Sequence, residues 1–103
     1  MTKSMITAAQ EFAKEYNRMT DAELAAELES QEDNRKFHME HCFFVPGNGA
    51  TMNSINARID GIRAVIAYRN TQKWMAQAVA TGMVTKEFAD NSINIMAENA
   101  FGE

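Results

Sequence analysis

Apolar residues recur at intervals of three and four positions along most of this chain, which is the spacing of one face of an α-helix. The first series predicts a helix over about residues 4–18, with an apolar face made of Met5, Ala9, Phe12, Ala13 and Tyr16. A second helix is expected over about residues 20–42, beginning at a capping box in which Thr20 and Glu23 bind each other's free backbone N–H. Its apolar face is sparse, because two polar residues, Gln31 and Arg35, interrupt the series Leu24, Leu28, Met39 and Cys42.

The series breaks clearly between Phe43 and Ser54. Pro46 disfavours helix at the residue before it, and the glycines that follow permit a positive φ. A third helix is predicted over about residues 53–81, capped by Thr51 or Asn53, with the apolar positions Ile55, Ile59, Ile62, Val65, Ile66, Met75 and Val79. Phe43–Val45 is at most a short extended piece, because clean alternation of apolar and polar residues never exceeds four positions.

Gly82 is placed to end the third helix in the left-handed conformation, and Thr85 is placed to cap a fourth helix over about residues 85–100. The fourth helix would bury Phe88, Ser92, Ile93, Met96 and Ala100. The predicted fold is therefore all-α, with four helices in a single domain that covers residues 1–103.

The third helix is the longest predicted element, at about 43 Å for a rise of 1.5 Å per residue. The other helices are too short to cover it, and Tyr68 and Trp74 add to the apolar surface left over. We therefore expect a homo-oligomer that associates through residues 53–81.

Composition narrows the functional classes. Of the 103 residues, 46% are hydrophobic and 23% are charged, which suits a folded domain and excludes a disordered tail. The single cysteine, Cys42, excludes a disulfide framework. The net charge of −4 disfavours direct binding to nucleic acid or to an anionic membrane. No apolar segment is long enough for a signal sequence or a membrane span, so we expect a cytoplasmic protein.

Candidate catalytic and metal-binding residues are few. His38, His41 and Cys42 share one side of a helix and could supply three zinc ligands. Structural zinc sites usually draw ligand pairs from two segments, and the chain has no second cysteine or histidine cluster, so the expectation is that no metal binds. A site completed by a glutamate or by a neighbouring subunit is the alternative. No nucleophile, phosphate-loop or metalloprotease motif occurs, so neither enzymatic activity nor a cofactor is expected.

The second helix opens with an acidic run, Asp21, Glu23, Glu27, Glu29, Glu32 and Asp33. Negative charge at a helix start favours the helix dipole, so this run can be simply a solvated face. The functional alternative is a docking surface for a partner, with Glu23, Glu27 and Glu29 as its contacts.

The third helix has the opposite sign, with Arg58, Arg63, Arg69 and Lys73. Tyr68, Arg69 and Trp74 are of the residue types that dominate binding hot spots, so they form a second candidate partner surface. Pairing of this basic helix with the acidic one inside the same chain is the simpler interpretation, and the two are compatible.

The break before the third helix is also a candidate anion site. Free backbone N–H groups at a helix start attract phosphate, and Gly47, Gly49, Thr51, Ser54 and Arg58 could together hold one. A plain turn is the alternative.

In its general character, the chain resembles small bacteriophage proteins that counter host defences, which are short, acidic, helical and without catalytic motifs. The resemblance implies a non-enzymatic inhibitor that binds a host protein complex in the host cytoplasm. It also implies an alternative, an oligomeric sponge for a phosphate-bearing signalling nucleotide such as a cyclic oligonucleotide.

Overall fold

The computed structural model describes residues 3–42 and 44–102, with side chains from residue 6 onward. The predicted position of Met5 on the first apolar face and the residue Phe43 therefore lie outside what the structure describes. Within the described residues the chain is all-α, as the sequence predicts, and no strand occurs there.

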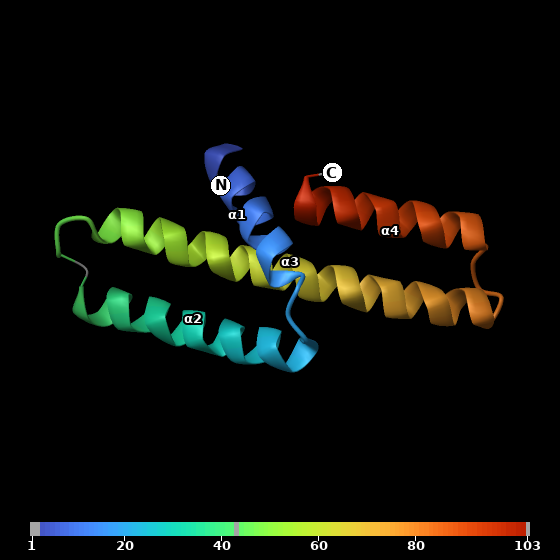
Figure 1. Cartoon of the computed structure of the whole chain (residues 1–103), viewed down its shortest axis with the longest axis horizontal. Helices are drawn as coiled ribbons and strands as arrows, with labels where there is room; N and C mark the ends of the chain where they lie inside the picture. The colour runs from blue at the N-terminus through green and yellow to red at the C-terminus, as the bar shows by residue number, and fades with distance from the viewer. Residues whose placement is uncertain (1–2, 43, 103) are drawn as a thin grey trace.

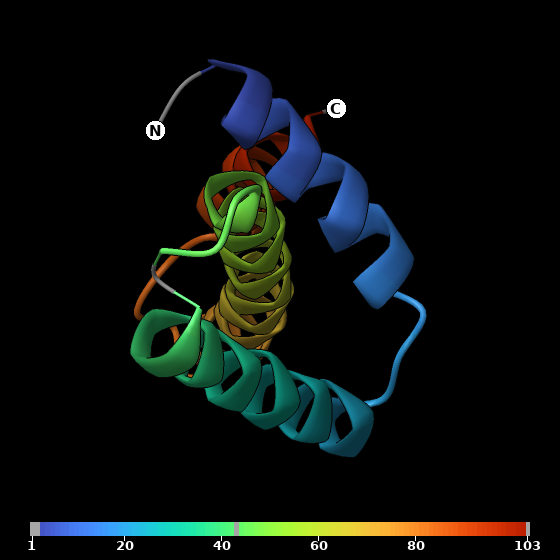
Figure 2. The same cartoon turned by 90° about the vertical axis from the view of Figure 1, so that its left-hand side faces the viewer.

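The described residues form four helices, α1 (Lys3–Tyr16), α2 (Asp21–His41), α3 (Asn48–Ala80) and α4 (Lys86–Phe101). Helix α3 is the axis of the molecule (Figure 1). Helix α2 runs antiparallel along its first half and α4 antiparallel along its second half, while α1 crosses near the middle (Figures 1 and 2). The result is an elongated body of 55 × 28 × 21 Å rather than a bundle of four parallel neighbours.

The crossing of α1 over α3 depends on Gly61. A Cβ at this position would lie 2.9 Å from the Ala9 carbonyl oxygen and 3.0 Å from the Ala13 nitrogen. Only glycine therefore lets the two helix backbones approach this closely. Around the crossing lies the core cluster, formed by Ala13, Tyr16, Leu24, Ile62 and Val65.

The predicted helix caps are present. Thr20 and Glu23 form the complete capping box of α2, and the Thr85 hydroxyl accepts the N–H of Phe88 at the start of α4. Gly82 has a φ of 76°. The N–H of Met83 donates to the carbonyl of Ala78, a hydrogen bond typical of the Schellman motif that ends a helix at a left-handed glycine.

The predicted start of the third helix is wrong by five residues, because α3 begins at Asn48. Gly47, with a φ of 83°, takes the N-cap position without a side-chain cap, and Thr51 and Asn53 lie inside the helix. Proline restricts only the residue before it. Once Gly47 has turned the chain, nothing prevents helix from Asn48 onward.

The predicted buried positions are correct in the first half of α3, whereas Ile66, Met75 and Val79 are only half-buried, and two predicted positions on α2 and α4 are exposed. Ile55, Ile59, Ile62 and Val65 are all buried. Met39 at the end of α2 is 60% exposed, because α2 and α3 leave an open pocket there. Phe88 is exposed as well, because α4 turns the small side chain of its neighbour Ala89 toward the interior.

Candidate functional site

The acidic start of α2 pairs with the basic residues of α3. Asp21 lies 2.9 Å from an Arg69 nitrogen and 3.4 Å from Lys73 Nζ. Farther along α2, Glu32 lies 2.9 Å from Arg63. The hydrogen bond from Arg69, followed by that from Lys73, holds the pKa of Asp21 below its usual value. The opposite charges of these helices therefore serve in part to join them.

Two of the three glutamates predicted to contact a partner have structural roles. Glu23 accepts the Thr20 N–H at 3.0 Å, and this hydrogen bond lowers the pKa of Glu23. Glu27 accepts hydrogen bonds from Tyr16 and Gln31. Glu29 is exposed and has no hydrogen bond or ion pair with any described residue. Of the three, Glu29 alone is available to a partner without loss of a contact in the described part of the chain.

Arg58 extends the contacts of Glu27 into a half-buried polar network. Its guanidinium lies 4.4 Å from the Phe12 ring centroid and donates to the Tyr16 hydroxyl at 3.3 Å. The same hydroxyl donates to Glu27 at 3.4 Å, and burial is the main cause that raises the pKa of Tyr16. At the far end, Gln31 donates to Glu27, while its own Oε1 is buried without a partner among the described residues.

The second predicted partner surface, on the C-terminal half of α3, is divided. The Tyr68 ring meets the Phe101 ring edge-on at 5.3 Å between centroids. Arg69 also donates to the backbone carbonyls of Asn17 and Met19, so it fastens the turn between α1 and α2. Trp74 is 64% exposed and is the one member of the three available for contact.

Sequence reasoning missed the most apolar exposed region, at the other end of the molecule. Phe37, Met39, Phe44 and Val45 are all exposed, Phe44 to 93%. We call these four residues the α2-end surface. A signal was present in the sequence, because Phe44 and Val45 stand just before Pro46, in the break between two predicted helices, and belong to no predicted apolar face. Large apolar side chains gathered in this way are typical of contact sites.

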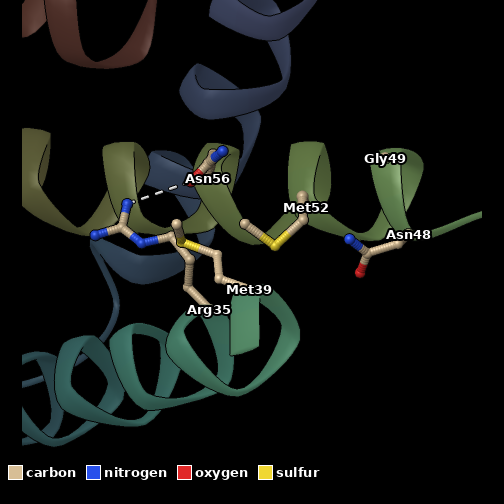
Figure 3. A pocket seen from close by; sticks show the side chains of 6 residues that line it. All are labelled: Arg35, Met39, Asn48, Gly49, Met52 and Asn56. Carbon is tan, nitrogen blue, oxygen red and sulfur yellow. Dashed lines mark hydrogen bonds between the residues drawn. The ribbon is translucent and has the colours of Figure 1, made fainter. Parts of the chain in front are cut away.

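A pocket of about 710 Å³ adjoins this surface, between the last turns of α2 and the first turns of α3 (Figure 3). Its lining consists of Arg35, Met39, Asn48, Gly49, Met52 and Asn56. Two polar contacts bridge the helices here, from Arg35 to the Asn56 amide oxygen at 3.2 Å and between His38 Nδ1 and the Asn48 amide oxygen at 3.2 Å. The thioethers of Met39 and Met52 give the pocket an apolar wall, and the guanidinium of Arg35 gives it a positive charge.

The residues of the predicted anion site do not converge. Gly49 lines the pocket, and Gly47 caps α3. Thr51 and Ser54 are exposed and do not line the pocket, and Arg58 is held against α1. Arg35, which the sequence did not suggest, is the cation of this pocket, and it donates to Asn56 about two turns into α3.

The candidate zinc ligands have other contacts. His38 contacts Asn48, and the His41 ring lies 4.9 Å from that of Phe37, while Cys42 is half-buried with a free thiol. Among the described residues, no three histidine, cysteine or acidic side chains are placed to hold a metal ion.

Comparison with known proteins gives no relative: no protein family, no curated protein and no solved structure matches the chain. Among the described helices, none is both long enough and apolar enough to span a membrane.

Proposed function

We propose that this chain is a non-enzymatic interaction protein that binds a host protein through the α2-end surface. The observation that carries the proposal is the exposure of Phe37, Met39, Phe44 and Val45 at the end of α2 and just after it, where Met39 also lines an open pocket. A role as a bacteriophage-type inhibitor, acting in the host cytoplasm on a defence or regulatory complex, agrees with the small size and the acidic helical character of the chain.

The charges around the α2-end surface indicate the chemistry of the partner. Arg35 lines the pocket, and the exposed Lys36 precedes Phe37. The exposed carboxylates Asp33 and Glu40 stand about one turn before and after Phe37, so the rim carries both signs of charge. An apolar segment of the partner would bury its apolar side chains on the surface, and charges of either sign on it would find a counterpart at the rim. Aromatic anchors surrounded by a polar rim are the usual anatomy of a protein interface.

The test is affinity capture from a bacterial host lysate with a Phe44→Ser, Val45→Ser double variant. We expect the wild type to capture a specific host protein that the double variant does not capture, because Phe44 and Val45 provide much of the surface. Met83→Ser is the matched control, because it removes an exposed apolar side chain between α3 and α4 and should leave capture unchanged. Equal capture by the double variant and the wild type would contradict the proposed surface.

The acidic residues of α2 are tested separately. Substituting lysine for Glu23 or Glu27 would also disturb the capping box or the hydrogen bond from Tyr16. A loss of capture in such variants would therefore not identify a contact with the partner. Glu29→Lys changes an exposed carboxylate without a contact in the described chain. If the acidic face binds the partner, this variant lowers capture at least several-fold; unchanged capture removes the face from the proposal.

The pocket favours a second candidate function, the binding of a phosphate-bearing nucleotide. Gly49 at the start of α3 and Arg35 line opposite ends of the pocket, and Met39 and Met52 between them offer thioethers against which a base could lie (Figure 3). Calorimetry with cyclic di- and trinucleotides tests this function. Binding should be weakened at least tenfold by Arg35→Ala and unaffected by Glu29→Gln. Absence of heat at millimolar ligand would contradict it.

Arg58→Ala distinguishes this pocket from the site expected from the sequence. Arg58, on α3, faces α1 and does not line the pocket, so a pocket-bound nucleotide should be insensitive to the change. If Arg58→Ala abolished binding and Arg35→Ala did not, the result would favour the anion site expected from the sequence, which includes Thr51, Ser54 and Arg58.

A further inference from the structure

The start of α3 places an asparagine directly before a glycine, at Asn48 and Gly49, and no other asparagine of the chain has a glycine after it. An asparagine side chain can react with the backbone nitrogen of the next residue, and glycine hinders that reaction least because it has no Cβ. Gly49 is exposed, and a Cβ built on it would have no atom within 4 Å. No other part of the described chain therefore shields this pair of residues (Figure 3).

The position of the pair within α3 leaves the attacking nitrogen free. Asn48 and Gly49 are the first two residues of the helix, where backbone N–H groups have no partner inside the helix. The Gly49 N–H donates no hydrogen bond to any described residue. Asn48 itself is held by its N–H to the Val45 carbonyl at 3.1 Å and by the contact with His38 at 3.2 Å. Its backbone can therefore rotate while the hydrogen bonds of α3 beyond the first turn stay in place.

A related pair farther along the helix is protected. Asp60 precedes Gly61, and an aspartate can form the same ring as an asparagine. Gly61 lies in the middle of α3, where its N–H belongs to the helical hydrogen-bond ladder. A Cβ at Gly61 would also lie 2.9 Å from the Ala9 carbonyl oxygen, because α1 crosses there. Reaction at Gly61 would require both the helix and the crossing to open, whereas reaction at Gly49 requires only the fraying of a helix end.

We propose that Asn48 is a site of covalent modification, at which the folded protein deamidates without an enzyme. A bond forms between the Gly49 nitrogen and Asn48 Cγ, and the bond from Cγ to Nδ2 breaks. The side-chain nitrogen leaves as ammonia and takes up the proton of the Gly49 nitrogen, so that a five-membered succinimide remains. Water then opens this ring at either carbonyl, which gives aspartate or isoaspartate at position 48.

Either product adds a carboxylate to the pocket between α2 and α3. Arg35 is the one charged residue of the lining, so the formal charge of the lining falls from +1 to 0. Aspartate suits the start of a helix because the helix dipole favours negative charge there. Isoaspartate instead inserts a methylene group into the backbone where α3 begins. Weaker binding of a phosphate-bearing ligand is the expected consequence; this consequence rests on the second candidate function, whereas the modification itself does not.

The test is to age the folded protein at neutral pH and body temperature and to map its peptides by mass spectrometry. Conversion of the amide to a carboxyl group raises the mass of the peptide that contains Asn48, and fragmentation locates the change and distinguishes the two products. A synthetic peptide with the sequence of residues 44–54 gives the rate of the unprotected reaction. Asn48 of the protein should convert within about tenfold of that rate, since helix ends open at little cost. Asn53 and Asn91, which precede serines inside helices, should stay largely unmodified over the same time.

Two variants separate the residue pair from its place in the helix. Gly49→Ala should slow the reaction at least tenfold, because the added methyl group crowds the attacking nitrogen. Ser54→Gly is the matched control, since it puts a glycine after Asn53, an exposed asparagine inside the same helix. In this variant Asn53 should react at least tenfold more slowly than Asn48 of the same molecules, because the nitrogen after Asn53 is held in the helical ladder.

Three results would each overturn the proposal. The first is an intact Asn48 after the synthetic peptide has fully converted, and the second is an unchanged rate in Gly49→Ala. The third is an equal rate at Asn48 and Asn53 in Ser54→Gly. None of these measurements involves a partner or a ligand, so both candidate functions are judged independently of them.

Discussion

The two halves of α3 are covered in different ways. Helix α2 contributes one fully buried large side chain, Leu24, and is otherwise joined to α3 by hydrogen bonds and ion pairs from Glu32, Arg35, His38 and Asp21. Helix α4 makes no hydrogen bond or ion pair with α3 among the described residues. It is held by small and half-buried apolar side chains and by the contact of Phe101 with the Tyr68 ring.

The difference follows from the two sequences. Gln31 and Arg35 stand where an apolar stripe on α2 would continue, so this helix can attach to α3 there only through polar groups. Alanines at 89 and 100 let α4 lie close to α3, where burial of apolar surface suffices. The α2 half should therefore respond to salt and acid, and the α4 half should not.

The largest expected effect comes from removing the apolar anchor of α2. Leu24→Ala should lower the free energy of unfolding by about 2–5 kcal/mol, because a fully buried leucine leaves both lost burial and a cavity. Urea denaturation measures the loss, and hydrogen exchange should quicken in α2 more than in α4. Leu28→Ala, which shortens a half-buried side chain, is the control and should cost less. A smaller loss for Leu24→Ala than for Leu28→Ala would mean that Leu24 is not the main apolar anchor of α2.

Helix α1 crosses α3 at Gly61, between the half of α3 covered by α2 and the half covered by α4. Gly61→Ala should destabilise the protein by about 1–3 kcal/mol, because the added methyl group meets backbone atoms of α1 that cannot move aside cheaply. Gly49→Ala is the control: its Cβ would have no atom within 4 Å, so the change should stabilise α3 by up to about 1 kcal/mol. No loss of stability in Gly61→Ala would contradict the close approach of α1 to α3.

The sequence predicted those features that depend on neighbours along the chain. The caps at Thr20, Gly82 and Thr85 and the apolar face from Ile55 to Val65 each follow from local spacing, and each is confirmed. Local spacing does not say which helix meets which, so it could not show that α2 and α4 divide α3 between them.

The candidate site was harder to predict for the same reason. Arg58 appeared to belong to the start of α3, yet the crossing of α1 places Phe12 and Tyr16 beside it. The pocket needs Arg35 and Met39 from α2 together with Met52 from α3, and only the tertiary arrangement brings these helices together.

A smaller effect is expected from salt. Exposed ion pairs contribute about 0–1 kcal/mol each, and 1 M NaCl shortens the screening distance to about 3 Å. Hydrogen exchange in α2 should therefore quicken by a factor of a few in 1 M NaCl, while exchange in α4 stays unchanged. Glu32→Gln should remove part of this sensitivity, because it eliminates the pair with Arg63. Equal responses of α2 and α4 to salt would break the contrast between the two halves.

The smallest expected effect is the response of the α2 half to acid. Hydrogen bonds from Arg69 and Lys73 lower the pKa of Asp21, and the backbone N–H of Thr20 lowers the pKa of Glu23. Both carboxyl groups therefore bind protons less readily in the folded chain than in the unfolded chain. Their contribution to stability is complete above the unfolded pKa values and is lost as the pH falls through the lower folded values.

Urea denaturation between about pH 6 and pH 2.5, a range that spans the ordinary carboxyl pKa values, measures this contribution. The double variant Asp21→Asn, Glu23→Gln should show a shallower fall in unfolding free energy with acid than the wild type, because its side chains no longer titrate. Glu29→Gln is the control and should keep the wild-type slope, since that carboxylate has no partner among the described residues. If the double variant and the control gave the same slope, the Asp21 ion pairs and the Glu23 cap would not contribute to stability, and α2 would be held to α3 by Leu24 together with the contacts of Glu32, Arg35 and His38.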